Sequence, residues 1–314
     1  MRILVVGAGA IGGYFGGRLL QAGRDVTFLV RPRRAAQLAK TGLVIRSTFG
    51  DADLPDPPSV AAENLREPFD LILLSCKAYD LASAADSFAP AVGADTAILP
   101  FLNGMAHLDF LVARFGSGAV LGGQCVISTT LDAGGRILHL NDTHLVSFGE
   151  CDGSRSVRAE AIAATMAGAR FDSRLSTAIL QEMWEKWVLI ATTAGITCLM
   201  RATVGDIVAA KGVALTTALL DECAAIAVAR GFAPGEAIRA RNRTMLTAPG
   251  STFAASMLRD IERGAPIEAD HIIGDLLRRG EGKDQDYPLL RIAYTHLKAY
   301  EARRQREITA RPAG

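Results

Sequence analysis

The feature that most constrains the fold is a glycine pattern at the start of the chain. Gly7, Gly9 and Gly12 form a G-x-G-x-x-G that directly follows an apolar run, Ile3 to Val6, with no polar face. Apolar residues then recur at helical spacing: Ile11, Phe15 and Leu19. The order of buried strand, tight glycine turn and helix predicts the first unit of a parallel α/β sheet.

Such a turn is typical of a dinucleotide-binding site. The first glycine permits the turn, the second lets the backbone approach a pyrophosphate, and the third lets the helix pack closely on the strand. The helix N-terminus then presents N–H groups and a positive dipole end to the phosphates. An ordinary glycine turn is the alternative. The residues expected to contact the cofactor are those of the turn itself: Gly7, Ala8, Gly9, Ala10, Ile11 and Gly12.

The second predicted strand, Asp25 to Val30, ends without an acidic residue. An NAD-selective site usually has Asp or Glu there to bond the ribose hydroxyls, whereas an NADP site needs cations for the extra phosphate. Arg31, Arg33 and Arg34 follow the strand. Because guanidinium groups match phosphate oxygens in pairs, we expect Arg31, supported by Arg33 or Arg34, to bind the 2′-phosphate of NADP. A solvated basic helix start is the alternative interpretation.

The composition limits the class of protein. A chain of 314 residues, 49% apolar and 21% charged, is long enough for two domains with cores of their own. A net charge of +1 gives no general field for nucleic acid, and no stretch is apolar enough to span a membrane. Five cysteines without a C-x-x-C and five histidines without paired spacing argue against a metal site and favour a reducing cytoplasm.

Strand-like and helix-like segments alternate over the first half, which predicts a mostly parallel sheet covered on both faces. We expect a short strand at Val44 to Arg46 and a loop at Asp51 to Ser59. An antiparallel hairpin is expected from Arg136 to Phe148, with its turn at Asn141-Asp142-Thr143. The further buried strands predicted are Leu71 to Ser75, Ala97 to Phe101 and Val120 to Ile127.

Strand signals stop at about residue 170, and helical periods dominate the rest. The sequence therefore predicts a Rossmann domain over residues 1–172 and an all-helical domain for substrate binding or dimerisation over residues 173–314. The apolar surface of the helices is compatible with a homodimer, and equally with a face that closes over the cleft. The predicted helices are Thr177 to Leu199, Val213 to Arg230, Pro234 to Leu246, Phe253 to Arg263, Ile267 to Arg279 and Tyr287 to Arg304.

Two polar residues follow buried strands. Lys77 comes just after Leu71 to Ser75, and Asn103 just after Ala97 to Phe101. Ligands of open α/β sheets bind beyond the carboxyl ends of the strands, so both residues fit a cofactor and substrate site. A solvated lysine and a simple Asn-Gly turn are the alternatives.

These residues, with others further along, give the chain a resemblance to the ketopantoate reductases (2-dehydropantoate 2-reductases). The resemblance implies a Rossmann half followed by a helical half, NADPH as cofactor, and reduction of a 2-keto acid to a 2-hydroxy acid, with 2-dehydropantoate as the leading substrate. Besides the glycine turn and Arg31, the segments that carry it are Cys76-Lys77-Ala78, Asn103-Gly104-Met105, Trp184-Glu185-Lys186, Ala255 to Asp260 and Ile267 to Asp270.

The resemblance also implies roles for individual residues. Lys186 corresponds to the lysine that donates a proton to the ketone oxygen as hydride arrives, and Glu268 to an acid at the nicotinamide ribose and near that lysine. Asn103 would contact cofactor and substrate, Lys77 the nicotinamide side of the cofactor, and Ser256 the substrate carboxylate. Without the resemblance, Lys186 reads as a snorkelling lysine and Glu268 as a charge that complements a helix start.

The chain departs from the family's usual pattern at two positions. Ile190 and Ala194 stand four and eight residues after Lys186, on the same helix face, where the family usually has asparagines that hydrogen-bond the substrate. The resemblance is therefore also compatible with a less polar 2-keto acid. Three nearby threonines could supply hydroxyls instead: Thr192, Thr193 and Thr197.

Two other classes of protein share features with this sequence. The β-hydroxyacid dehydrogenases combine similar domains with a helix-borne lysine, but usually carry G-x-G-x-M-G, where this chain has Ile11. A binding protein that senses NADPH without turnover is the non-enzyme alternative. Retention of Lys186, Ser256 and Glu268 favours the enzyme.

Overall fold

The structure, a computed structural model, describes residues 1–282 and 286–310 and divides the chain into two compact units. The first comprises residues 1–102 and 107–180. The second comprises Asn103–Ala106 and the chain from Gln181 onward. The division thus differs from the expected boundary at 172/173, because a short strand after residue 170 joins the first unit and a four-residue segment of the N-terminal half joins the second.

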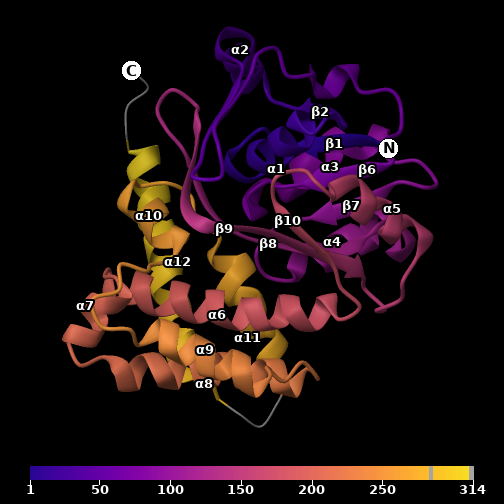
Figure 1. Cartoon of the computed structure of the whole chain (residues 1–314). Coiled ribbons are helices and arrows are strands. Elements are labelled where there is room, and N and C mark those ends of the chain that lie inside the picture. Colours follow the sequence, from indigo (N-terminus) through magenta and orange to yellow (C-terminus); the bar gives the residue numbers. More distant parts are fainter. Residues whose placement is uncertain (283–285, 311–314) are drawn as a thin grey trace. The chain divides into compact units, whose positions relative to one another are not determined.

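The first unit contains a five-stranded parallel sheet in the order β5-β2-β1-β6-β7. Its central strands are apolar on both faces and almost completely buried, as expected for a sheet covered on both sides. Figure 1 shows these strands in indigo and purple. The strands are β1 (Arg2–Val6), β2 (Asp25–Leu29), β5 (Ser59–Val60), β6 (Leu71–Leu74) and β7 (Ala97–Pro100), which confirms four of the predicted strands.

A second sheet in the same unit has the order β10-β9-β3-β4, with β8 paired to β9. The strand predicted at Val120 to Ile127 belongs to this sheet rather than to the parallel one, where it makes only an isolated bridge, Ile98 to Val120. The long ribbon of β8 and β9 is prominent in Figure 1. The strands are β3 (Leu43–Arg46), β4 (Ala52–Leu54), β8 (Leu121–Leu131), β9 (Ile137–Glu150) and β10 (Asp172–Leu175).

The predicted hairpin within Arg136 to Phe148 is wrong. β9 continues through Asn141-Asp142-Thr143 and pairs antiparallel with β8, with the pairing jumping from His139–Thr129 to His144–Ile127. The turn lies earlier, at Asp132 to Gly135, where Gly135 has φ +79°. Residues 140–143 form a bulge opposite Ser128, whose backbone N–H donates to the side-chain oxygen of Asn141 (2.8 Å).

Two further expectations are wrong. The loop predicted at Asp51 to Ser59 contains β4, which pairs with β3, and the first residue of β5. The expectation that strands end at residue 170 misses β10, which pairs in parallel with β9. Both β4 and β10 are three or four residues long, too short for an alternating pattern to stand out in the sequence.

Helix α1 (Ala10–Gln21) packs against both sheets, which explains why it is rich in glycine. An added Cβ at Gly16 would meet Phe28 of the parallel sheet, and one at Gly17 would meet Ile45 of the second sheet, both within 3 Å. The helix therefore fixes the glycine turn from both sides. The other helices of the N-terminal half are α2 (Pro32–Thr41), α3 (Leu81–Phe88), α4 (Ala106–Phe115) and α5 (Val157–Met166).

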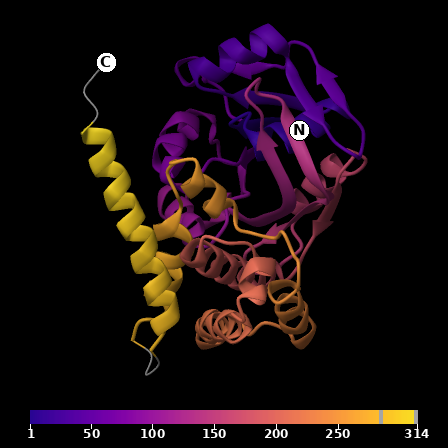
Figure 2. The same cartoon turned by 90° about the vertical axis from the view of Figure 1, so that its left-hand side faces the viewer.

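The described part of the second unit is helical from α6 onward, as predicted, and Figure 2 shows α12 as its long final helix. The structure adds one short unpredicted helix, α7, which begins with a Thr203–Asp206 capping box. The helix expected over Ile267 to Arg279 starts as a π-helical turn, Asp270–Gly274. The helices are α6 (Ile179–Met200), α7 (Val204–Ala209), α8 (Val213–Ala229), α9 (Glu236–Leu246), α10 (Ser256–Glu262), α11 (Asp275–Gly280) and α12 (Pro288–Thr309).

None of the described helices is both long enough and apolar enough to cross a bilayer.

Candidate active site

The glycine turn between β1 and α1 is shaped by two different requirements. Gly7 has φ +92°, a conformation that L side chains rarely adopt, and its N–H donates to the carbonyl of Leu29 on β2 (2.9 Å). Gly12 lies so close to Ser75 and to the Gly7 carbonyl that a side chain would not fit. The turn is therefore built for tight packing of α1 on the sheet.

Gly9 is different, because no neighbour among the described residues requires a glycine there. Its φ is −81°, and an added Cβ would meet no atom within 4 Å. Gly9 is also the N-cap of α1, and no side chain caps that helix end. Open space beside an uncapped helix N-terminus fits the close approach of a phosphate group, so these residues suit a dinucleotide.

Two of the candidate cofactor residues lie at the same carboxyl edge of the parallel sheet. Arg31 follows β2 as the N-cap of α2, and Lys77 follows β6 as the N-cap of a 3₁₀ turn, Ala78–Asp80. The end of that turn brings a carboxylate to the arginine, because Asp80 pairs with Arg31 at 2.9 Å. This contact raises the pKa of Arg31. The end of β2 itself carries no acid, as expected, but Asp80 reaches Arg31 from a distant segment.

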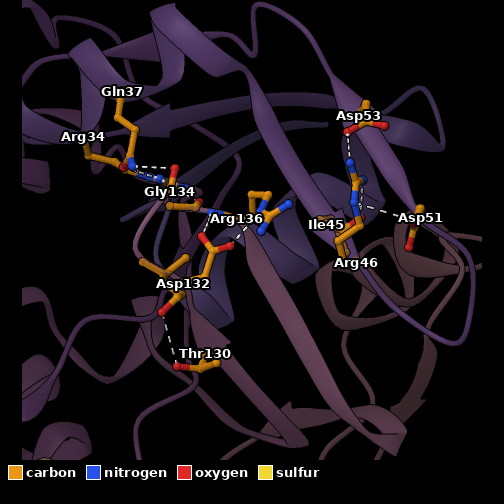
Figure 3. A network of polar contacts seen from close by, with 12 residues as sticks. Arg34, Gln37, Ile45, Arg46, Asp51, Asp53, Thr130, Asp132, Gly134 and Arg136 are labelled. Carbon is orange, nitrogen blue, oxygen red and sulfur yellow. Dashed lines mark hydrogen bonds and ion pairs between the residues drawn. The ribbon is translucent and has the colours of Figure 1, made fainter.

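Arg34 takes a structural role. Its Nε donates to the carbonyl of Ala8 in the glycine turn (2.9 Å), and its Nη1 donates to Gln37 (2.6 Å) and to the carbonyl of Gly135 (3.0 Å). Figure 3 shows Arg34 and Gln37 pointing together at the β8–β9 turn near Gly134. Arg34 thus connects α2 to the glycine turn and to the β8–β9 turn. Arg33 is exposed.

In the second unit, a hydrogen bond joins the region of Lys186 to that of Glu268. Lys186 lies on α6, and the indole of the next residue, Trp187, donates to the carbonyl of Ile272 (2.8 Å). The N–H of Ile272 in turn donates to the carbonyl of Glu268 (3.0 Å). Trp187 is 1% exposed, so water cannot replace the Ile272 carbonyl as the partner of its indole N–H. Loss of this bond would leave a buried donor unsatisfied, which costs free energy. These two bonds therefore join the segments that carry Lys186 and Glu268.

Asn103 belongs to the same unit through His271. The imidazole of His271, in the π-helical turn, hydrogen-bonds to the backbone of Asn103. Gly104 packs directly on the same histidine, because an added Cβ would lie 2.9 Å from the His271 carbonyl oxygen and 3.1 Å from its ring. Asn103 is therefore held against the turn that follows Glu268.

Ser256 is connected to the far end of α6. Its neighbour Ala255 donates its N–H to the hydroxyl of Thr197 (3.3 Å), and Ser256 begins α10 with an exposed side chain. Thr197 stands eleven residues after Lys186 on the same face of α6. The backbone before Ser256 is therefore attached to the helix that carries Lys186.

The threonines on α6 do not replace the missing asparagines as donors. Thr192, Thr193 and Thr197 each donate to the carbonyl four residues earlier, at 2.7–2.8 Å. Each is at most 3% exposed. Ala194 is likewise buried. Beyond Lys186, this face of α6 therefore offers Ile190 and methyl groups rather than hydrogen-bond donors.

The described residues contain no group of three or more metal-ligating side chains, and the five cysteines are free thiols. Sequence inspection missed Asp80, Trp187 and His271. The first two have no local signal, since their partners lie 49 and 85 residues away. His271 could have been noticed because it follows Glu268 by three residues, roughly one helical turn.

The sequence matches two parts of one known family. Residues 3–153 match the description "Ketopantoate reductase PanE/ApbA", and residues 178–301 match the C-terminal part of the same family. Together the matches span most of both units. The chain belongs to the ketopantoate reductase family. It is therefore an oxidoreductase with a Rossmann-like domain and a helical domain.

Individual relatives resemble the chain along almost its whole length. An "uncharacterized oxidoreductase YkpB" of Bacillus subtilis is 37% identical over 303 residues, covering 96% of this chain and 99% of the relative. The 2-dehydropantoate 2-reductase of Mesorhizobium japonicum is 28% identical, covering 92% and 94%. The solved 2-dehydropantoate 2-reductase of Methylococcus capsulatus is 29% identical with a TM-score of 0.85, covering 97% and 98%.

Proposed function

We propose that the chain uses NADPH to reduce a 2-keto acid to the corresponding 2-hydroxy acid. The observation that carries the proposal is that the segments containing Lys186, Glu268 and Asn103 are joined, although they come from three distant stretches of sequence. Hydrogen bonds of Trp187 and His271 hold these three stretches together. A lysine ammonium, a carboxylate and an amide are the groups needed to bind and protonate a keto acid.

The first unit would bind the cofactor. The N-terminus of α1 and the open space at Gly9 suit the pyrophosphate, with the turn residues Gly7 to Gly12 around it. Arg31 is 70% exposed and lies at the end of β2, where a 2′-phosphate would be recognised. Lys77, at the end of β6, would contact the nicotinamide side. When bound, NADPH supplies a hydride to the carbonyl carbon of the substrate.

The second unit would bind the substrate. Lys186 donates a proton to the carbonyl oxygen, where negative charge develops, and so completes the hydroxyl group of the product. Glu268 would contact the ribose next to the nicotinamide and support the ammonium group of Lys186. Asn103 orients the keto acid, and the hydroxyl of Ser256 binds its carboxylate.

Two substrates deserve comparison. The names of the relatives favour 2-dehydropantoate. The apolar face of α6 favours a second candidate, a branched 2-keto acid without the hydroxyl group, because Ile190 and Ala194 cannot bond a substrate hydroxyl and the threonine hydroxyls are committed to their own helix. An apolar wall discriminates only weakly between such acids, by about 1–3 kcal/mol per methylene.

The test is steady-state NADPH oxidation with 2-dehydropantoate and with 3,3-dimethyl-2-oxobutanoate, which has the same skeleton without the hydroxyl. Turnover of either acid supports the reductase, and the larger kcat/KM identifies the substrate class. Lys186→Met is expected to lower kcat by a factor of about 10²–10⁴ and to leave NADPH binding unchanged. Failure of the wild-type protein to reduce any 2-keto acid would overturn the proposal, as would full activity of the Lys186 variant.

A further inference from the structure

His271 lies at the junction of two segments that carry candidate site residues. On one side it follows Glu268 by three residues, in the π-helical turn Asp270–Gly274. On the other it hydrogen-bonds to the backbone of Asn103. Gly104, with φ +80°, packs its backbone against the imidazole ring. A Cβ added to Gly104 would lie only 3.1 Å from Cδ2 of His271. Only a residue without a side chain allows this approach.

The turn that carries His271 is held from a second direction. A π-helical turn frees backbone groups from the regular i→i−4 ladder, and such turns are often found at functional sites. Here the Ile272 carbonyl accepts from Trp187 of α6 (2.8 Å). His271 thus projects from a backbone that is fixed to the helix of Lys186, so its position relative to that helix is set.

The state of the imidazole makes the contact directional. Burial lowers the pKa of His271, while Glu268, Asp275 and the Asn103 backbone raise it and Arg278 lowers it. Burial is the largest of these effects and holds the pKa of His271 below its ordinary value of 6.5, which favours the neutral ring at pH 7. A neutral imidazole has a single N–H donor, so the contact with the Asn103 backbone selects one tautomer and one ring orientation.

We infer that His271 is a positioning residue: by clamping the Asn103–Ala106 segment onto the turn after Glu268, it sets the direction in which the Asn103 side chain points. The inference rests on the proposed function for its catalytic consequence. The preceding residue, Asp270, does not share this role, because its carboxylate accepts hydrogen bonds from Tyr294 and Lys298 of α12.

The test compares His271→Leu, which keeps the bulk and removes the hydrogen bond, with His271→Gln, which keeps an N–H donor. For His271→Leu we expect kcat/KM for the keto acid to fall about tenfold, because a displacement of about 1 Å in a positioning group can cost up to 10² in rate. NADPH affinity should change less than twofold. His271→Gln should recover most of the loss.

A double-mutant cycle separates positioning from general damage. If His271 acts through Asn103, then adding His271→Leu to Asn103→Ala should cause no further loss of kcat/KM. Asp270→Asn is the matched control: it perturbs the outer side of the same turn and should lower thermal stability without changing kcat/KM. Additive losses from His271→Leu and Asn103→Ala, or unchanged kcat/KM in His271→Leu, would overturn the inference.

Amide hydrogen exchange gives a readout that needs no substrate. His271→Leu should accelerate exchange in residues 101–108, and Asp270→Asn should not. If the wild-type protein reduces no 2-keto acid, the proposed function fails, but the exchange of this segment still decides whether His271 clamps it. Unchanged exchange in His271→Leu would contradict the clamp whatever the activity.

Discussion

Arg31 and Asp80 form a 2.9 Å ion pair at the carboxyl edge of the parallel sheet. The two residues come from different βα units, so the pair exists only in the folded protein. Both side chains retain solvent exposure, 70% for the arginine and 34% for the aspartate. A pair this exposed contributes less than about 1 kcal/mol, so a phosphate group can compete for the arginine.

This pair leads to a prediction about cofactor choice. Arg31→Gln should weaken NADPH binding about tenfold or more and leave NADH binding nearly unchanged, because a charge-assisted bond to the 2′-phosphate is lost. Asp80→Asn should strengthen NADPH relative to NADH several-fold, since it removes a negative charge beside the phosphate. Cofactor fluorescence titrations measure both. Equal weakening of NADH and NADPH by Arg31→Gln would exclude Arg31 as the phosphate ligand.

Trp187 allows a second prediction, about how the backbone supports Lys186. Trp187→Phe keeps an aromatic ring but leaves the Ile272 carbonyl without its donor, which costs about 1–3 kcal/mol of unfolding free energy for a buried acceptor. Because the turn after Glu268 then loses its tie to α6, kcat should also fall about tenfold. Urea unfolding and steady-state kinetics measure the two effects.

Trp184 provides the matched control. Its ring stacks on Phe232, with centroids 5.3 Å apart, and is equally buried. Trp184→Phe should therefore lower stability through lost packing while kcat stays within about twofold of the wild type. A similar loss of kcat in both variants would mean that the bond to Ile272 has no special role.

The apolar face of α6 gives a third prediction. Introducing amides by Ile190→Asn and Ala194→Asn should raise kcat/KM for 2-dehydropantoate relative to 3,3-dimethyl-2-oxobutanoate by about tenfold or more, because a site that bonds a hydroxyl rejects the analogue lacking it. Ile190→Leu is the size-matched control and should leave the ratio unchanged. An unaltered ratio in the double asparagine variant would show that this face does not contact the distal part of the substrate.

Much of the fold could be predicted because its signals are local. β1, β2, β6 and β7 are short apolar runs bounded by turn residues, and α6 and α8 repeat apolar residues at helical spacing. The glycine turn is equally local, since Gly7 and Gly12 meet requirements set by the adjoining strand and helix. These elements depend little on the rest of the chain.

The missed features depend on distant partners. Asn141-Asp142-Thr143 has the composition of a turn, but it forms a bulge in β9 opposite Ser128, whose N–H donates to the Asn141 side chain. Asp80 reaches Arg31 only because β6, which precedes Asp80, and β2, which precedes Arg31, both lie beside β1 in the sheet. The π-helical turn at Asp270–Gly274 is stabilised by Trp187, 85 residues earlier. Composition and periodicity contain none of this information.

The last prediction concerns the acid stability of the first unit. Glu150, at the end of β9 and 8% exposed, accepts from Arg158 at 2.7 and 2.6 Å and from the hydroxyl of Ser156 at 2.5 Å. The bonds from Arg158 hold the pKa of Glu150 below its ordinary value of 4.5. The carboxylate therefore stabilises the fold above the unfolded pKa, and this contribution is lost as pH falls through the folded pKa.

Glu150→Gln should accordingly cost about 2 kcal/mol at pH 7, the loss expected for a largely buried charge-assisted pair. The difference from the wild type should stay constant between about pH 6 and 8, shrink below about pH 4.5 and vanish in stronger acid. Denaturant unfolding across this pH range measures it. Glu160→Gln, which affects an exposed pair with Arg155, should cost less than about 0.5 kcal/mol. A deficit of Glu150→Gln that persists unchanged at pH 3 would mean that the carboxylate charge is not what stabilises this junction.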